Sequence, residues 1–134
     1  MKVILDTNVI VSALLTPAGL PAVILNLVLR GTVTVVYDNA IMAEYIDVLG
    51  REKLKINREL ADLVIDFISK EGEYTIANSH KIHFHFIDED DRKFYELFKT
   101  GGINYLITGN TRHFPNERGI VTPRKFMEKE YALT

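Results

Sequence analysis

The segment Lys2-Val3-Ile4-Leu5-Asp6-Thr7-Asn8-Val9 contains three consecutive apolar residues and then turns polar at Asp6. An apolar run without a polar face is typical of a short strand that is covered on both sides in a parallel sheet. Asp6 would follow the carboxyl end of that strand, at the edge of an open α/β sheet where ligands usually bind. A second interpretation stays open, because Asp, Thr and Asn at this place also cap a following helix. The role of Asp6 therefore depends on whether other acidic residues reach the same edge.

The rest of the chain alternates between strand and helix patterns. β-branched and apolar runs predict further strands at residues 32–37, 73–77, 103–107 and 119–122. Apolar or amphipathic segments between them predict helices at residues 9–15, 22–29, 40–49, 58–70, 91–98 and from Pro123 onward. This alternation predicts an α/β protein with a parallel sheet.

The predicted helix at 58–70 and the segment at 81–86 carry side-chain predictions of their own. In the helix at 58–70, the predicted inward face consists of Leu60, Leu63, Val64, Phe67 and Ile68. In residues 81–86, Lys81, His83 and His85 alternate with Ile82, Phe84 and Phe86. A His-x-His pair on a strand can bind a metal ion, but a polar outer face is the simpler interpretation, and no site is assigned to these histidines.

Length and composition predict one soluble domain over residues 1–134. The hydrophobic fraction is 47% and the charged fraction is 25%, which are ordinary values for a globular protein. The sequence shows neither a membrane-spanning run nor a signal-peptide pattern, so we expect a cytoplasmic protein without a membrane partner. The absence of cysteine excludes disulfides, thiol catalysis and Cys-based zinc sites. A net charge of −2 is not the usual charge of a nucleic-acid-binding protein, so any polyanion site has to be local.

Two further acidic residues are predicted to reach the edge at which Asp6 lies. Glu44 borders the buried face of the helix at 40–49, and Asp91 begins the inward stripe of the next predicted helix. Asp90, in the same acidic run, is the alternative to Asp91. Nearby carboxylates raise one another's pKa unless a cation binds, and carboxylates without Cys or regular His spacing favour Mg²⁺ or Mn²⁺. The polar side chains that could orient water or phosphate beside such a cation are Thr7, Asn8, Thr108 and Asn110.

Four motifs together resemble a PIN domain, in order from residue 2 to about residue 127. They are Asp6-Thr7-Asn8-Val9 after an apolar strand, Glu44 within residues 42–49, Asp88-x-Asp90-Asp91-x-x-Phe94, and Tyr105-Leu106-Ile107-Thr108-Gly109-Asn110 followed by Phe114-Pro115. The likeness is greatest to small prokaryotic PIN proteins that are described as toxins of toxin–antitoxin pairs.

This resemblance implies a three-layer α/β/α sandwich and a Mg²⁺- or Mn²⁺-dependent endoribonuclease that hydrolyses RNA phosphodiester bonds by a metal-bound water. It implies that Asp6, Glu44 and Asp91 bind the metal and that Asn110 is the fourth catalytic position. Many family members have Asp at that position, and Asn supplies a neutral donor instead, so one metal ion and two metal ions both stay open. The implied partners are RNA, a small antitoxin protein and a second copy of the chain in a homodimer.

The cations near the site are candidates for contacts with the RNA backbone. Arg112 and His113 are the nearest in sequence, and Arg118, Arg124 and Lys125 follow.

Three other functional classes are alternatives to the nuclease. The strongest is a non-catalytic PIN-like module that binds RNA or protein. A receiver-type signalling domain requires two adjacent acids after the first strand and a Lys after the last, where this chain has Asp6 alone and Thr122-Pro123. A haloacid-dehalogenase-type phosphatase requires an Asp at position 8, which is Asn8, and no Walker-type phosphate loop occurs.

Overall fold

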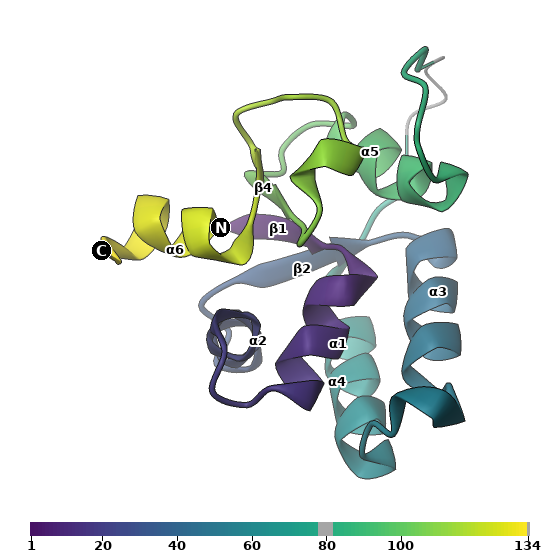
Figure 1. Cartoon of the computed structure of the whole chain (residues 1–134), viewed down its shortest axis with the longest axis vertical. Helices are drawn as coiled ribbons and strands as arrows, with labels where there is room; N and C mark the ends of the chain where they lie inside the picture. Colours follow the sequence, from purple (N-terminus) through teal and green to yellow (C-terminus); the bar gives the residue numbers. More distant parts are fainter. Residues whose placement is uncertain (78–81, 134) are drawn as a thin grey trace.

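A five-stranded, all-parallel sheet forms the centre of the protein (Figure 1). The computed structural model describes residues 1–77 and 82–133, and every count below refers to these ranges. The strands are β1 (Lys2–Leu5), β2 (Thr34–Tyr37), β3 (Glu73–Tyr74), β4 (Tyr105–Ile107) and β5 (Ile120–Val121). Their order in the sheet is β3-β2-β1-β4-β5, so the chain adds strands on one side of β1 and then returns to its other side.

Six α-helices flank the sheet. They are α1 (Thr7–Leu15), α2 (Leu20–Leu29), α3 (Asn39–Leu49), α4 (Arg58–Glu71), α5 (Arg92–Phe98) and α6 (Pro123–Tyr131). Short 3₁₀ turns lie at η1 (Glu52–Leu54), η2 (Glu89–Asp91) and η3 (Thr111–His113). Right-handed crossovers put α1 to α4 on one side of the sheet and α5 on the opposite side (Figure 1). The predicted α/β/α sandwich is therefore confirmed.

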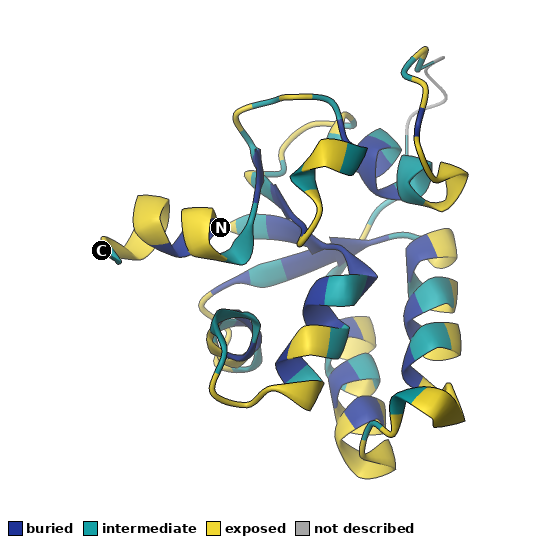
Figure 2. Ribbon diagram, in the orientation of Figure 1, coloured by how far each residue is buried: buried dark blue, intermediate teal, exposed yellow. Residues whose placement is uncertain are grey.

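The core surrounds β1, whose apolar side chains are almost completely excluded from solvent (Figure 2). Val3, Ile4 and Leu5 are each at most 1% exposed, as expected for a strand covered on both faces. The α2 helix contributes Ala22, Ile24, Leu25 and Val28 to the same core. No single described helix is long and apolar enough to cross a bilayer; α1 and α2 reach that length and composition only as a pair, and they meet at 102°.

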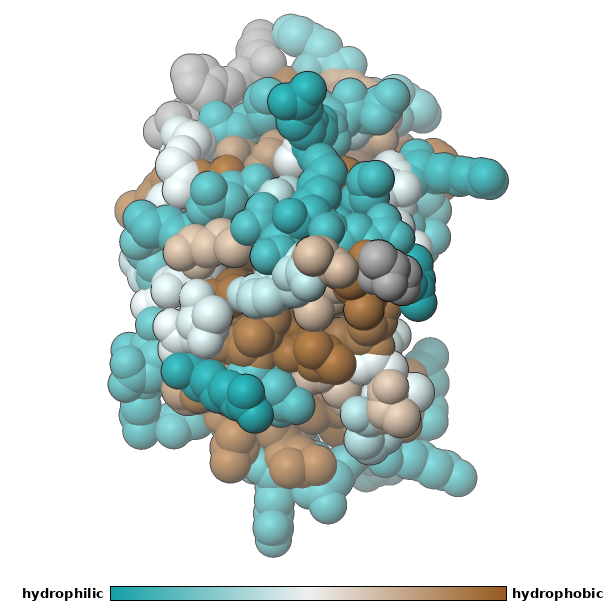
Figure 3. Space-filling view, turned by 90° about the vertical axis from the view of Figure 1, so that its left-hand side faces the viewer, coloured by the Kyte–Doolittle hydropathy of each residue, from teal (hydrophilic) through white to brown (hydrophobic). Residues whose placement is uncertain are grey.

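The α4 helix buries only part of the predicted face. Val64 and Ile68 are buried as predicted and Phe67 is half-buried, whereas Leu60 is 48% and Leu63 is 53% exposed. The buried stripe of Ala61, Val64 and Ile68 also has helical spacing, and contact with α3 and β3 turns it inward. Hydrophobic side chains also reach the surface in the middle of the face that carries α2 and α6 (Figure 3).

The segment at residues 82–86 is not a strand. Its backbone is instead held by Arg92, whose guanidinium donates hydrogen bonds to the carbonyl oxygens of Ile82 at 2.8 Å and Phe84 at 3.0 Å. The predicted alternation is still visible in the exposure, because Phe86 is buried and the histidines at 83 and 85 are exposed. Lys81 lies outside the described residues.

Candidate active site

The carboxyl ends of β1 and β4 form the point at which the strand order reverses. The register pairs Leu5 with Ile107, so Asp6 and Thr108 follow as neighbours at one edge of the sheet. The backbone N–H of Asp6 also donates to the carbonyl of Ile107 at 2.9 Å. Ligands of open α/β sheets bind outside the carboxyl ends of the strands at such a reversal.

Asp6 is held at this edge by two hydrogen bonds. Its side chain is the N-cap of α1 and accepts from the backbone N–H of Asn8 at 3.4 Å. This contact explains why α1 begins at Thr7 and not at Val9, the start that the apolar run predicts. The other oxygen, Oδ2, accepts from Thr108 Oγ1 at 2.8 Å. Capping and a place at the sheet edge are therefore compatible, and Asp6 is only 6% exposed.

Glu44 reaches the same edge from α3. Its Oε2 accepts a hydrogen bond from Thr7 Oγ1, and its Oε1 forms an ion pair of 2.7 Å with Lys93 Nζ. The next residue, Tyr45, is fully buried and donates its hydroxyl hydrogen bond to the Leu5 carbonyl. Tyr45 thereby ties α3 to the end of β1 and fixes the approach of Glu44.

Asp91 arrives from η2, immediately before α5. Its Oδ2 lies 3.1 Å from His113 Nδ1, which joins it to the loop after β4. Asp90 is exposed, and its contacts are made by its backbone: its N–H donates to Asp88 Oδ1 at 2.9 Å and its carbonyl accepts from Lys93. Of the two acids, Asp91 is the one whose side chain contacts the loop after β4.

The loop after β4 is joined to α1 through side chains. Gly109 donates its N–H to Asn8 Oδ1 at 3.2 Å, and Asn110 donates its N–H to Thr108 Oγ1 at 3.0 Å. The predicted supporting residues Asn8 and Thr108 thus connect the two strand ends. Asn110 is exposed and enters this network through its backbone.

The carboxylates act on one another electrostatically. Burial is the main cause that raises the pKa of Asp6 to about 6, with further increases from the charges of Asp91 and Glu44. The hydrogen bonds from Thr108 and Asn8 act in the opposite direction. Burial also raises the pKa of Asp91, and Glu44 adds to this shift while His113 opposes it. The charges of Glu44 and Asp91 therefore act on Asp6, and the charge of Glu44 acts on Asp91.

The candidate RNA-contacting cations divide between the two edges of the sheet. Arg112 is exposed in η3, next to His113, and Arg124 and Lys125 begin α6 after β5. Arg118, by contrast, lies beside Met1 and Asn104, which precede β1 and β4. Its place at the amino-terminal edge excludes it from the site, because a residue that precedes a parallel strand lies opposite to one that follows it.

A comparison with protein-family models matches the PIN domain over residues 2–112. The match runs from β1 into η3 and includes Asp6, Glu44, Asp91 and Asn110. The chain belongs to the PIN domain family. PIN domains generally have nuclease activity and generally use divalent metals. The comparisons with curated proteins and with solved structures gave no match.

The acidic groups of this PIN domain suit a hard cation in their chemistry. Carboxylate oxygens are the donors that Mg²⁺ and Mn²⁺ prefer. Within residues 1–77 and 82–133, no hydrogen bond or ion pair joins Asp6 to a Lys, Arg or His. In the same ranges, no group of three or more His, Cys, Asp or Glu side chains is arranged to hold a metal ion. Two of the acids instead contact basic side chains, Glu44 the Lys93 ammonium and Asp91 the His113 imidazole.

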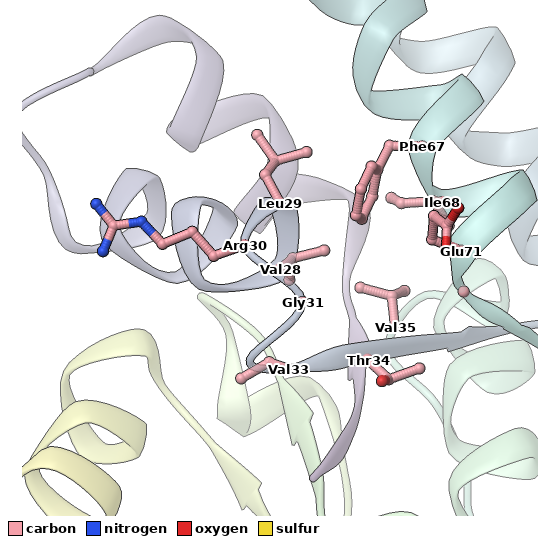
Figure 4. A pocket seen from close by; sticks show the side chains of 11 residues that line it. Val28, Leu29, Arg30, Gly31, Val33, Thr34, Val35, Phe67, Ile68 and Glu71 are labelled. Carbon is pink, nitrogen blue, oxygen red and sulfur yellow. The ribbon is translucent and has the colours of Figure 1, made fainter.

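A separate cavity of this PIN domain lies at the amino-terminal edge of the sheet, between the carboxyl-terminal ends of α2 and α4 (Figure 4). Its volume is about 350 Å³, and its lining includes Val28, Val35, Phe67 and Ile68. Arg30 extends away from Phe67 and Ile68 (Figure 4). None of the site's carboxylates lines this cavity, so we do not place the active site there.

Sequence reasoning missed Lys93 as a residue of the site. The only available signal was its place two residues after Asp91, in a charged run of four acidic and then two basic residues. Such runs usually form a solvated surface.

Proposed function

We propose that this PIN domain is a Mg²⁺- or Mn²⁺-dependent endoribonuclease, with Asp6, Glu44 and Asp91 as its metal-binding acids. The observation that carries the proposal is Asp6: a buried carboxyl at the reversal point of the sheet, near two other acids and without a cationic partner in the described residues. A buried, unpaired carboxylate is unfavourable, and a bound cation would compensate for its charge.

The protein's own residues would orient these acids. Thr108 fixes Asp6 Oδ2, and Thr7 fixes Glu44 Oε2. Among the described residues, Asp6 Oδ1 accepts a side-chain hydrogen bond from the Asn8 N–H alone. A divalent cation at this place would neutralise charge on an RNA phosphate and make a water molecule more acidic. Arg112, exposed next to His113, is the first candidate to hold the RNA backbone, and Asn110 offers an exposed amide in the loop after β4.

A cleavage assay with two neighbouring variants tests this assignment. In Mn²⁺, Asp91→Asn should lower the rate of RNA cleavage at least about tenfold, because loss of a metal-site group typically costs 10- to 100-fold. Asp90→Asn is the matched control. It removes the same charge from the preceding residue, whose side chain is exposed. We expect it to stay within about threefold of the wild type. Equal rates in the two variants, or full activity in excess EDTA, would show that the assignment is wrong and would favour a non-catalytic PIN-like module.

We also propose that the protein is the toxin of a toxin–antitoxin pair and acts in the cytoplasm. Support comes from its likeness to small prokaryotic PIN toxins and from the acidic edge, which suits a basic segment of a small antitoxin protein. Induced expression in a bacterial host should then slow growth, and Asp6→Asn should restore it. Equal growth of the two strains at equal protein levels would contradict the toxin role.

The proposed homodimer has a candidate surface on α4. Leu60 and Leu63 are exposed beside the half-buried Phe67, and exposed apolar groups of this kind favour association. Light scattering of the purified chain measures the mass directly, and a monomer at all concentrations tested would contradict this proposal.

A further inference from the structure

The Lys93 ammonium lies against Glu44, one of the proposed metal-binding acids. It lies in the first turn of α5, and its side chain is only 19% exposed. Its Nζ makes three contacts: the ion pair with Glu44 Oε1, a hydrogen bond to the Asp90 carbonyl, and a position 5.2 Å from the centre of the Phe94 ring. A long, flexible side chain is therefore held over one carboxylate of the acidic group.

Both oxygens of Glu44 already have partners. Thr7 Oγ1 donates to Oε2 and Lys93 donates to Oε1. Thr7 is neutral and can remain while Glu44 binds a cation. Lys93 is positively charged, and two cations on one carboxylate oxygen repel each other strongly at short distance.

We infer that Lys93 is the internal counter-ion of the site: it neutralises Glu44 in the metal-free protein and has to leave Glu44 Oε1 before a divalent cation binds there. This inference rests on the proposed function, because it requires Glu44 to be a metal-binding acid. It makes Lys93 a positioning residue that lowers the affinity for the metal. The Lys93 ammonium also offsets the negative charge that Glu44 exerts on Asp6 and Asp91.

Lys99 provides a matched control on the same helix. It is the C-cap of α5, its Nζ pairs with Glu117 at 2.9 Å, and it lies 5.8 Å from the centre of the Tyr95 ring. It therefore shares with Lys93 an ion pair and an aromatic neighbour, but its partner is outside the acidic site. Replacing either Lys by Met removes one positive charge from the same protein.

The test is a calorimetric titration of Mn²⁺ into the full chain at pH 7.5 and about 0.15 M salt, where long-range charge effects are screened within about 8 Å. We expect Lys93→Met to bind Mn²⁺ about tenfold more tightly than the wild type. The Mn²⁺ affinity of Lys99→Met should stay within about twofold of the wild-type value. The affinity of Lys93→Arg, which keeps the charge, should stay close to the wild-type value. Lys93→Gln is the substitute if the Met variant does not fold, and the increase in melting temperature on adding Mn²⁺ gives a second measure.

The outcomes separate this inference from the proposed function. If the wild type binds Mn²⁺, Asp6→Asn does not, and Lys93→Met binds no more tightly than Lys99→Met, the metal site stands and the counter-ion role of Lys93 is wrong. If neither the wild type nor any variant binds Mn²⁺, both are wrong.

Discussion

Asp6→Asn is expected to lower Mn²⁺-dependent RNA cleavage at least about a hundredfold. The substitution keeps the size of the side chain and replaces its charge by a neutral amide. Asp6 is the most buried of the three acids and sits between Thr108 and the start of α1. Losing a supporting residue of a metal site already costs 10- to 100-fold, so losing this central ligand should cost at least as much. The measurement is the initial rate of cleavage of a single-stranded RNA at saturating Mn²⁺.

Asp47→Asn is the control for this variant. Asp47 lies on α3 with Glu44, but it is exposed and pairs with Arg51. Its replacement should leave the rate within about twofold. If Asp6→Asn retains most of the wild-type activity, the carboxylate at this position is not part of the reaction.

The same substitution is expected to stabilise the metal-free protein at neutral pH. The pKa of Asp6 is about 6 in the folded protein, against an ordinary value of 3.8 that applies to the unfolded chain. Ionisation is therefore less favourable in the folded state, mainly because the group is buried. The protonated Asp6 carboxyl makes its full contribution to the free energy of unfolding below about pH 4. This contribution is lost as the pH rises through about 6. By pH 7 this loss amounts to about 3 kcal/mol.

Urea unfolding in EDTA between pH 4.5 and 7.5 measures this effect. The free energy of unfolding of Asp6→Asn should exceed that of the wild type by little at pH 4.5 and by about 1 to 3 kcal/mol at pH 7.5, since the amide cannot ionise. The exposed Asp47→Asn should show no such trend, because breaking an exposed ion pair changes stability by about 1 kcal/mol or less. A difference that does not grow with pH would contradict the raised pKa of Asp6. Added Mn²⁺ should reduce the difference by binding the wild type alone.

The sequence was sufficient to predict the site's framework. The apolar run before Asp6 predicted a buried strand, and the alternation of elements predicted that parallel strands would bring polar residues to one edge. Glu44 follows from the helical spacing of Ile41 and Tyr45, which are both fully buried. These features depend on local periodicity and on the topology of parallel sheets, and both can be seen without coordinates.

The remaining features depend on tertiary contacts that periodicity does not contain. On α4, two apolar faces have the same spacing, and only packing against α3 and β3 selects Ala61 over Leu60. The segment at 82–86 alternates like a strand, but the Arg92 guanidinium takes the place of a neighbouring strand. Lys93 meets Glu44 across two elements that are far apart in sequence, so its role depends on the folded structure alone.

The most direct test of the account is the structure of a crystal soaked in Mn²⁺. We predict anomalous density bounded by Asp6, Glu44 and Asp91, with the Lys93 ammonium no longer on Glu44 Oε1. The absence of density among these three carboxylates at saturating Mn²⁺ would contradict the central claim that they form the metal site of a nuclease.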